Sequence, residues 1–316
     1  MPVDNPVPPE VAYTLYIIIA SIIIVCDVPF IVMIFWNRSQ KELVIVGFMC
    51  IADTAHAIAF LVSGAIRLWI ALNHEGGNSI TNTQCIRYYF PVIFLYSYQL
   101  MGAATLVVSI DRFIAVMKPV YYRTLSNAFS FYIMAGVILY VSIIALLFIY
   151  IVQTGPALPS SPNCFTSESY TPEIWRYMLF FRMSTLIVSS LLYLPISWRI
   201  YKMANALKRG ASSDNYSRKI IKTTRTIGFT VAAEFVFVVI PDIFLNFNPF
   251  GLARYQVIWY ICGVSKGAIN VLLVTLQHDE IFKLLNRKFR RLSKQPTATT
   301  VLTSSNVRSE RNLGAF

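Results

Sequence analysis

Long apolar blocks constrain this chain more than any other feature of its sequence. Residues 88–110 and 124–167 contain no Asp, Glu, Lys or Arg. A helix needs about 20 apolar residues to cross roughly 30 Å of hydrocarbon. Of the 316 residues, 56% are hydrophobic and 13% are charged, whereas a soluble domain carries about 25% charged residues. The sequence therefore predicts an integral membrane protein built from helices.

Hydropathy, read with charges, Pro and Gly as boundaries, predicts seven membrane spans. We place them near residues 11–36, 43–71, 87–116, 129–152, 174–201, 223–246 and 255–277. The expected fold class is all-α, a seven-transmembrane helix bundle.

A short amphipathic helix is expected after the seventh span. Residues 279–291 would place four apolar side chains on one helical face opposite a basic face, which is typical of a helix lying along anionic lipid; they are Ile281, Phe282, Leu285 and Phe289. Residues 1–291 would form the seven-helix domain, and 292–316 are too poor in apolar residues to fold alone, so a disordered tail is expected there.

The basic residues indicate how the chain crosses the membrane. The net charge is +12, but Lys and Arg flank the apolar blocks, so we expect a lipid surface and no nucleic acid as the partner of this charge. All but six of the 27 Lys and Arg residues lie around the connections after spans one, three and five or in the tail. Positive loops stay in the cytoplasm. We therefore expect a multi-pass plasma-membrane protein with an extracellular amino terminus and a cytoplasmic carboxyl terminus.

Five cysteines fall into two groups. Cys26, Cys50 and Cys262 lie inside apolar blocks and are interpreted as small buried hydrophobic residues. Cys85 and Cys164 flank spans on the predicted extracellular side. This placement favours one disulfide bond in an oxidising compartment.

The strongest local motif stands at the cytoplasmic end of the third span. Asp111, Arg112 and Phe113 are followed by Pro119, seven residues after the Arg. An Asp beside an Arg can hold it in an ion pair in one conformation and release it in another. This motif resembles that of the rhodopsin-like G-protein-coupled receptors, in which the released Arg engages a heterotrimeric G protein.

Other positions match that family. Asp53 stands at the place of its second-span acid, and Asp27 near its first-span Asn. Phe235 and Pro241 keep its spacing of six in the sixth span and would form the activation joint, and Asn270 matches the Asn of its seventh-span motif.

Departures from the family pattern narrow the resemblance. Val239 replaces a Trp, and Val271 and Val274 replace the Pro and Tyr after Asn270. This combination of matches and losses is similar to the nematode serpentine chemoreceptors, and most of all to their sx class. The resemblance implies a chemosensory receptor that binds a small-molecule or peptide ligand in its outer half, signals through a G protein, and resides in sensory neurons, with the sensory cilium as one location.

Lys266 is an unusual residue for a membrane span. An ammonium there needs an anion or open water, and Lys266 lies four residues before Asn270, on the same helical face. We expect it to pair with Asp53 or Asp27 and to take the place of the sodium ion that the family binds nearby. Opsins have their retinal lysine six residues before the Asn, so no retinal and no other cofactor is expected here.

The ligand pocket is the least readable part of the sequence. Candidates on the third span are Phe90, Phe94, Tyr98 and Gln99. Phe94 stands where amine receptors have an Asp, which argues against a monoamine. Four arginines near the outer side would favour a carboxylate ligand, although Asp242 could instead pair with Arg182 or Arg254 in a structural bridge; the four are Arg67, Arg87, Arg176 and Arg182.

The ionisable residues of the chain also bear on two other classes of protein, enzymes and ion channels or transporters. An enzyme or a metal site is not expected, because His56, His74 and His278 are widely separated and form no His-Glu-x-x-His pattern. An ion channel or transporter is the stronger alternative, since the spans contain four ionisable residues that could line an ion path; these are Asp27, Asp53, Glu234 and Lys266.

Overall fold

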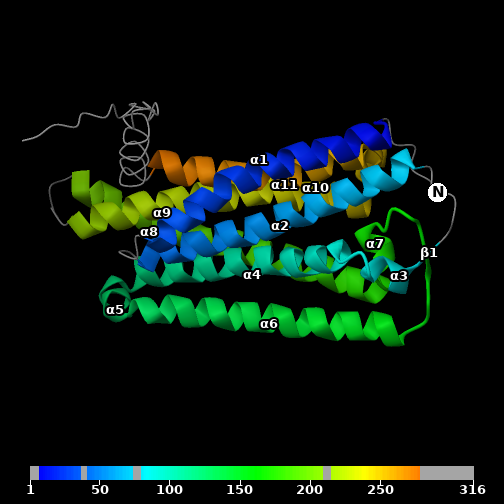
Figure 1. The fold of residues 1–316 in the computed structure, drawn as a ribbon. Helices are drawn as coiled ribbons and strands as arrows, with labels where there is room; N and C mark the ends of the chain where they lie inside the picture. Colours follow the sequence, from blue (N-terminus) through cyan, green and yellow to red (C-terminus); the bar gives the residue numbers. More distant parts are fainter. Residues whose placement is uncertain (1–6, 37–40, 74–79, 209–214, 278–316) are drawn as a thin grey trace, which may run out of the picture. The chain divides into compact units, whose positions relative to one another are not determined.

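The computed structural model describes residues 7–36, 41–73, 80–208 and 215–277 (Figure 1). The predicted amphipathic helix at 279–291 and the tail at 292–316 lie outside these residues.

Among the described residues, seven spans are long and apolar enough to cross a membrane, which confirms that prediction. Five are single helices: α1 (Pro9–Trp36), α2 (Lys41–Leu72), α4 (Phe90–Met117), α6 (Asn127–Thr154) and α8 (Pro172–Lys208). The sixth span consists of α9 (Asn215–Glu234), η2 (Phe235–Val239) and α10 (Ile240–Phe247), and the seventh is α11 (Gln256–Gln277). In Figure 1 they run side by side along the length of the bundle.

Short elements mark the two ends of the bundle (Figure 1). One end carries β1 (Ile80–Thr81), α3 (Asn82–Ile86), β2 (Pro159–Ser160) and α7 (Thr166–Ser169), and we call it the disulfide end. There β1 pairs antiparallel with β2. The opposite end carries α5 (Pro119–Thr124) and is called the Arg112 end. The 3-10 helix η3 (Pro249–Tyr255) joins the sixth span to the seventh.

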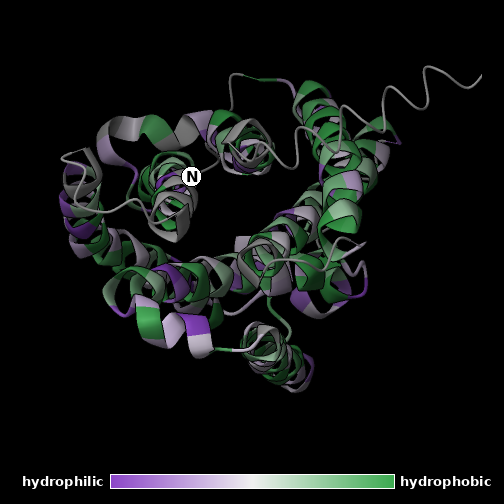
Figure 2. Cartoon of the chain, turned by 90° about the vertical axis from the view of Figure 1, so that its left-hand side faces the viewer, coloured by the Kyte–Doolittle hydropathy of each residue, from purple (hydrophilic) through white to green (hydrophobic). Residues whose placement is uncertain are grey.

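Burial follows from the position of each helix in the bundle. Helices α2 and α4 are mostly buried, whereas α1 and α6 expose large apolar side chains such as Leu139, Leu146 and Tyr150. Figure 2 looks along the bundle and shows hydrophobic residues over much of every helix. Apolar residues on outward faces suit contact with lipid, because lipid tails are as apolar as a protein core.

The sixth span changes its helical geometry halfway along. In η2, the Ile240 N–H donates to the Phe235 carbonyl five residues back, which is the hydrogen bond of a π-helix. Pro241 follows directly and has no N–H to donate. The wide turn of the π-helix accommodates Pro241 between α9 and α10, where an α-helix would kink.

Candidate functional site

The Arg112 end holds a compact polar cluster of Asp111, Arg112 and Tyr122. Arg112 is fully buried and its guanidinium forms an ion pair with Asp111, with its Nε donating to Asp111 Oδ2 at 2.9 Å. Arg112 Nη2 donates to the Tyr122 hydroxyl at 2.9 Å, and that hydroxyl donates to Asp111 Oδ2 at 3.2 Å. Tyr122 therefore bridges both members of the pair.

Pro119 is responsible for the position of Tyr122. It begins α5, where its fixed φ suits a first helical residue, and the short helix folds Tyr122 back beneath α4. Phe113 is half-buried beside the pair. Sequence reasoning missed Tyr122 as a partner of Arg112, although the Pro followed by an aromatic one turn later was a usable signal.

A second polar group, the buried ionic cluster, consists of Asp53, Glu234, Lys266 and Asn270. The Lys266 ammonium lies 2.7 Å from Asp53 Oδ1 and 2.6 Å from Glu234 Oε1. Asn270 donates to the other Asp53 oxygen at 2.8 Å. Each of the four residues is at most 4% exposed, so one ammonium connects the second, sixth and seventh spans in a water-poor interior.

Asp27 lies close to this cluster but has a different partner. Its Oδ2 accepts a hydrogen bond from Thr54 at 3.3 Å, while its Oδ1 has no hydrogen-bond partner among the residues described. Gly267 of α11 allows this helix to approach α1 and α2 closely. A Cβ at that position would lie 3.1 Å from Ile23 Cγ2 and 3.4 Å from Asp53 Cβ. Of the two acids expected near Lys266, the structure places Asp53 against the ammonium.

The two sixth-span residues expected to form the activation joint differ in burial. Pro241 is buried, whereas Phe235 is 40% exposed and lines a cleft of about 820 Å³ between α8 and α9. Glu234, the residue before Phe235, is 1% exposed and points to Lys266. Sequence reasoning did not assign Glu234 to this cluster.

A cavity of about 280 Å³ lies near the disulfide end, between α4, α8, α10 and α11. Arg182 and Asp242 form a buried ion pair in its wall. The Arg182 guanidinium carbon lies 3.7 Å from the centre of the Tyr98 ring, a favourable cation–π position. Apolar side chains complete much of the lining, among them Trp175, Leu179, Leu245 and Tyr260.

The six ligand candidates divide between this cavity and the core. Tyr98, Arg182 and Asp242 line the cavity. Phe90 lies beneath the Arg67 guanidinium at 5.1 Å, Phe94 packs against Phe60 at 4.9 Å between ring centres, and Gln99 is fully buried.

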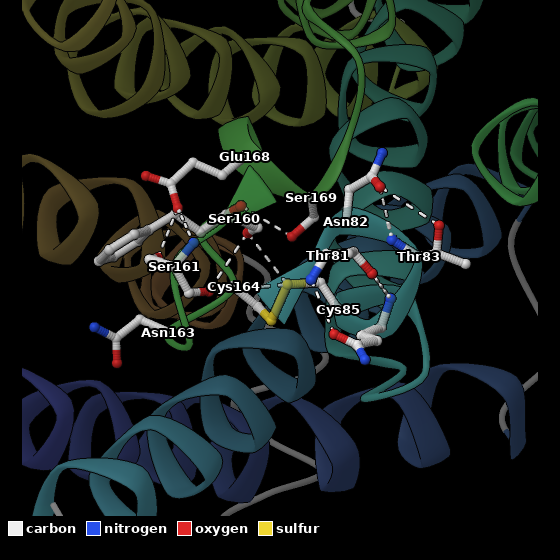
Figure 3. Close-up of a disulfide and its surroundings, with 12 residues drawn as sticks. Thr81, Asn82, Thr83, Cys85, Ser160, Ser161, Asn163, Cys164, Glu168 and Ser169 are labelled. Atoms are coloured by element: carbon white, nitrogen blue, oxygen red, sulfur yellow. Dashed lines mark hydrogen bonds between the residues drawn. A yellow bond between two sulfur atoms is a disulfide. The ribbon is translucent and has the colours of Figure 1, made fainter. Parts of the chain in front are cut away.

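The predicted disulfide bond joins Cys85 of α3 to Cys164 in the loop before α7, which confirms the pairing (Figure 3). Arg67 donates from Nε to the Asn163 carbonyl at 2.8 Å and from Nη2 to the Cys164 carbonyl at 3.1 Å. This arginine therefore holds the loop by backbone hydrogen bonds. Glu168 accepts from the Ser161 hydroxyl at 2.6 Å and fixes the same loop (Figure 3).

Comparison with known proteins identifies a family to which the chain is similar. The family described as "Serpentine type 7TM GPCR chemoreceptor Srsx" matches residues 18–249. No curated protein matches the chain. The family comprises receptors and not enzymes, as expected from the sequence. Because the match spans most of the chain and agrees with seven spans and the disulfide bond, the protein belongs to the Srsx family of serpentine seven-transmembrane G-protein-coupled chemoreceptors.

Proposed function

We propose that this receptor binds a small ligand in the cavity beside Arg182 and activates a heterotrimeric G protein at the Arg112 end. The observation that supports the proposal most strongly is that two buried ion pairs fix the sixth span at two positions along its length. Asp242 in α10 pairs with Arg182 in α8, and Glu234 at the end of α9 pairs with Lys266 in α11. The π-helix η2 and Pro241 lie between these positions.

This arrangement gives the sixth span two alternative packings. A ligand shifts an equilibrium only by binding one conformation more tightly than the other. A ligand that contacts Arg182 and Asp242 changes the tie between α8 and α10, and the wide turn of η2 can absorb the resulting displacement. The Glu234–Lys266 pair opposes outward movement of α9, so we expect it to favour the inactive packing.

Arg112 is the contact released toward the G protein in this proposal. In the described structure it is fully buried and pairs with Asp111 and Tyr122. Displacing α5 would remove the Tyr122 bridge and expose the guanidinium. Basic residues in the last turns of α8, such as Lys202, would then face an acidic partner or anionic lipid.

The proposed orientation puts the disulfide end outside the cell. It is supported by the Lys and Arg distribution, with 21 of the 27 lying around the odd-numbered connections and the tail. The oxidising conditions outside the cell also suit a Cys85–Cys164 bond. Labelling of an amino-terminal epitope on intact cells would support this orientation, and labelling that requires permeabilised cells would refute it.

The test is a G-protein recruitment assay in cells that express the receptor, screened with pooled small volatile, acidic and peptide ligands. Arg112→Ala is expected to abolish recruitment at unchanged surface expression. Glu234→Gln is expected to raise recruitment without ligand several-fold, because it removes the charge that holds α9 to Lys266. Ligand-gated current through the receptor in a bilayer without G protein would instead support a channel.

A further inference from the structure

We propose that the cavity beside Arg182 selects a small zwitterion, a molecule that carries both a carboxylate and an ammonium group and resembles an amino acid. The inference rests on the proposed function only for the position of the ligand. Its basis is the charge arrangement in the cavity wall.

The wall of the cavity is electrically balanced. Arg182 and Asp242 are 4% and 5% exposed and pair with each other. A simple carboxylate that approached Arg182 would bring a second negative charge beside Asp242, and like charges in a poorly solvated site repel strongly. A simple cation would meet the same difficulty at Arg182. A ligand that carries both charges keeps the site neutral.

Both members of the pair retain unused hydrogen-bonding capacity. Arg182 Nε and Asp242 Oδ2 have no hydrogen-bond partner in the described part of the chain. Buried donors and acceptors without partners are unfavourable. A ligand carboxylate can accept from Arg182 in the two-bond geometry that a guanidinium favours, and a ligand ammonium can donate to Asp242. Because both atoms are enclosed, the ligand has to part Arg182 from Asp242 before it can supply these bonds.

The dimensions and the remaining lining suit a molecule of this kind. A volume of about 280 Å³ is at the small end of ligand pockets. Trp175, Leu179, Leu245 and Tyr260 offer apolar contacts for a side chain. We therefore expect an apolar or aromatic amino acid, or a small amine–carboxylate of similar size, to fit better than a charged peptide.

This inference replaces the sequence-based expectation of an anionic ligand. That expectation depended on arginines near the disulfide end. Two of them are already engaged, since Arg67 donates to backbone carbonyls and Arg182 pairs with an acid.

The experiment measures thermal unfolding of the purified full-length receptor with matched compounds. The series contains amino acids with uncharged side chains, the N-acetyl derivative of each, which is an anion, and the methyl ester of each, which is a cation. We expect at least one zwitterion to raise the unfolding midpoint by a few degrees, and both of its derivatives to bind about 10- to 100-fold more weakly. No stabilisation by any zwitterion, or equal stabilisation by an N-acetyl derivative, overturns the proposal.

Two variants provide a second measurement that does not depend on loss of binding. Asp242→Asn leaves a positive wall and is expected to shift preference to the N-acetyl derivative. Arg182→Gln leaves a negative wall and is expected to shift preference to the methyl ester. Unchanged preference in both folded variants contradicts the inference.

The same compounds distinguish this inference from the proposed function, because stabilisation needs no G protein. Stabilisation by a zwitterion that never recruits a G protein refutes the proposed function and leaves the inference intact. G-protein recruitment by a ligand without a carboxylate, or by one without an ammonium group, refutes the inference and leaves the proposed function intact.

Discussion

Lys266 places a permanent positive charge in the middle of the bundle. Its ammonium lies within 2.7 Å of carboxylate oxygens on two other spans. An ion of the same charge, such as sodium, would compete for the same oxygens. We therefore expect that no sodium ion binds at that position, because the chain itself supplies the cation.

We predict that stability of the wild-type receptor does not depend on sodium. Its unfolding midpoint should be equal in sodium chloride and in choline chloride at the same ionic strength. Lys266→Gln leaves Asp53 and Glu234 without a cation, so it should lower the free energy of unfolding by about 3–5 kcal/mol. Sodium should then restore part of this loss, because it can occupy the vacated position.

Lys202→Gln is the matched control, because Lys202 is an exposed lysine whose ammonium lies 5.0 Å from the Trp198 ring centre. It should unfold like wild type in both salts. Stabilisation of the wild type by sodium over choline would contradict the idea that Lys266 takes the place of the ion.

Individual contacts could be predicted from the sequence where spacing determines a helical face, or where a charged residue in a span requires a partner of opposite charge, as for Asp242 with Arg182. Lys266 and Asn270 are four residues apart and lie on one face of α11, toward Asp53. Glu234 escaped this reasoning because the π-helix after it changes the phase of the sixth span. Tyr122 escaped because a short helix had to fold back before it reached Arg112.

Gly102 lies where α4 packs closely against α8. A Cβ added to Gly102 would lie 2.5 Å from Thr185 Oγ1 and 3.4 Å from the Arg182 Cα. The Thr185 hydroxyl donates to carbonyls of its own helix and has little freedom to move. Close approach of these helices also positions Arg182 over the Tyr98 ring.

We predict that Gly102→Ala lowers the free energy of unfolding by about 1–3 kcal/mol, as overpacking does in other cores. Thr185→Ala removes the oxygen that the new methyl group would meet. The double variant should therefore be more stable than the sum of the two single changes predicts, by about 0.5 kcal/mol or more in a thermodynamic cycle. Strictly additive effects would show that the two helices do not meet as described.

The boundaries of the elements were less predictable than their number. Helix α8 runs to Lys208 and α9 begins at Asn215, whereas hydropathy placed the ends of those spans at 201 and 223. Hydropathy detects the part of a helix that lipid surrounds and not the polar turns that continue beyond it. The π-helix lies inside the sixth span, where hydropathy does not distinguish one helical geometry from another, and Pro241 was its only signal in the sequence.

The seven spans and the disulfide pairing could be predicted because each depends on a general property of the chain. Uncharged blocks longer than the hydrocarbon thickness leave helices as the solution, and two cysteines on one side of the membrane leave one pairing. The cavity could not be predicted, because its lining comes from four spans and from Ser167 of the short helix α7.

We predict that Cys85→Ser lowers the free energy of unfolding by about 2–5 kcal/mol, as loss of a native disulfide commonly does. Surface expression should fall with it, because the loop that closes the disulfide end loses its covalent tie to α3. Cys26→Ser is the control, since Cys26 lies outside the disulfide bond. The interpretation of Cys26 as a buried residue was wrong, because its side chain points out of the bundle and is exposed. Equal unfolding midpoints for the two variants would contradict a stabilising role for the bond.

The ion pairs of the sixth span also affect how the chain enters the membrane during synthesis. Its two acids would each cost about 2.5–3.5 kcal/mol near the centre of an isolated helix in lipid. The partner of Asp242 is in the fifth span, which emerges from the ribosome earlier, but the partner of Glu234 is in the seventh, which emerges later. We therefore expect the sixth span to remain beside the insertion machinery until Lys266 has been synthesised. The last three spans would then enter the bilayer as one group.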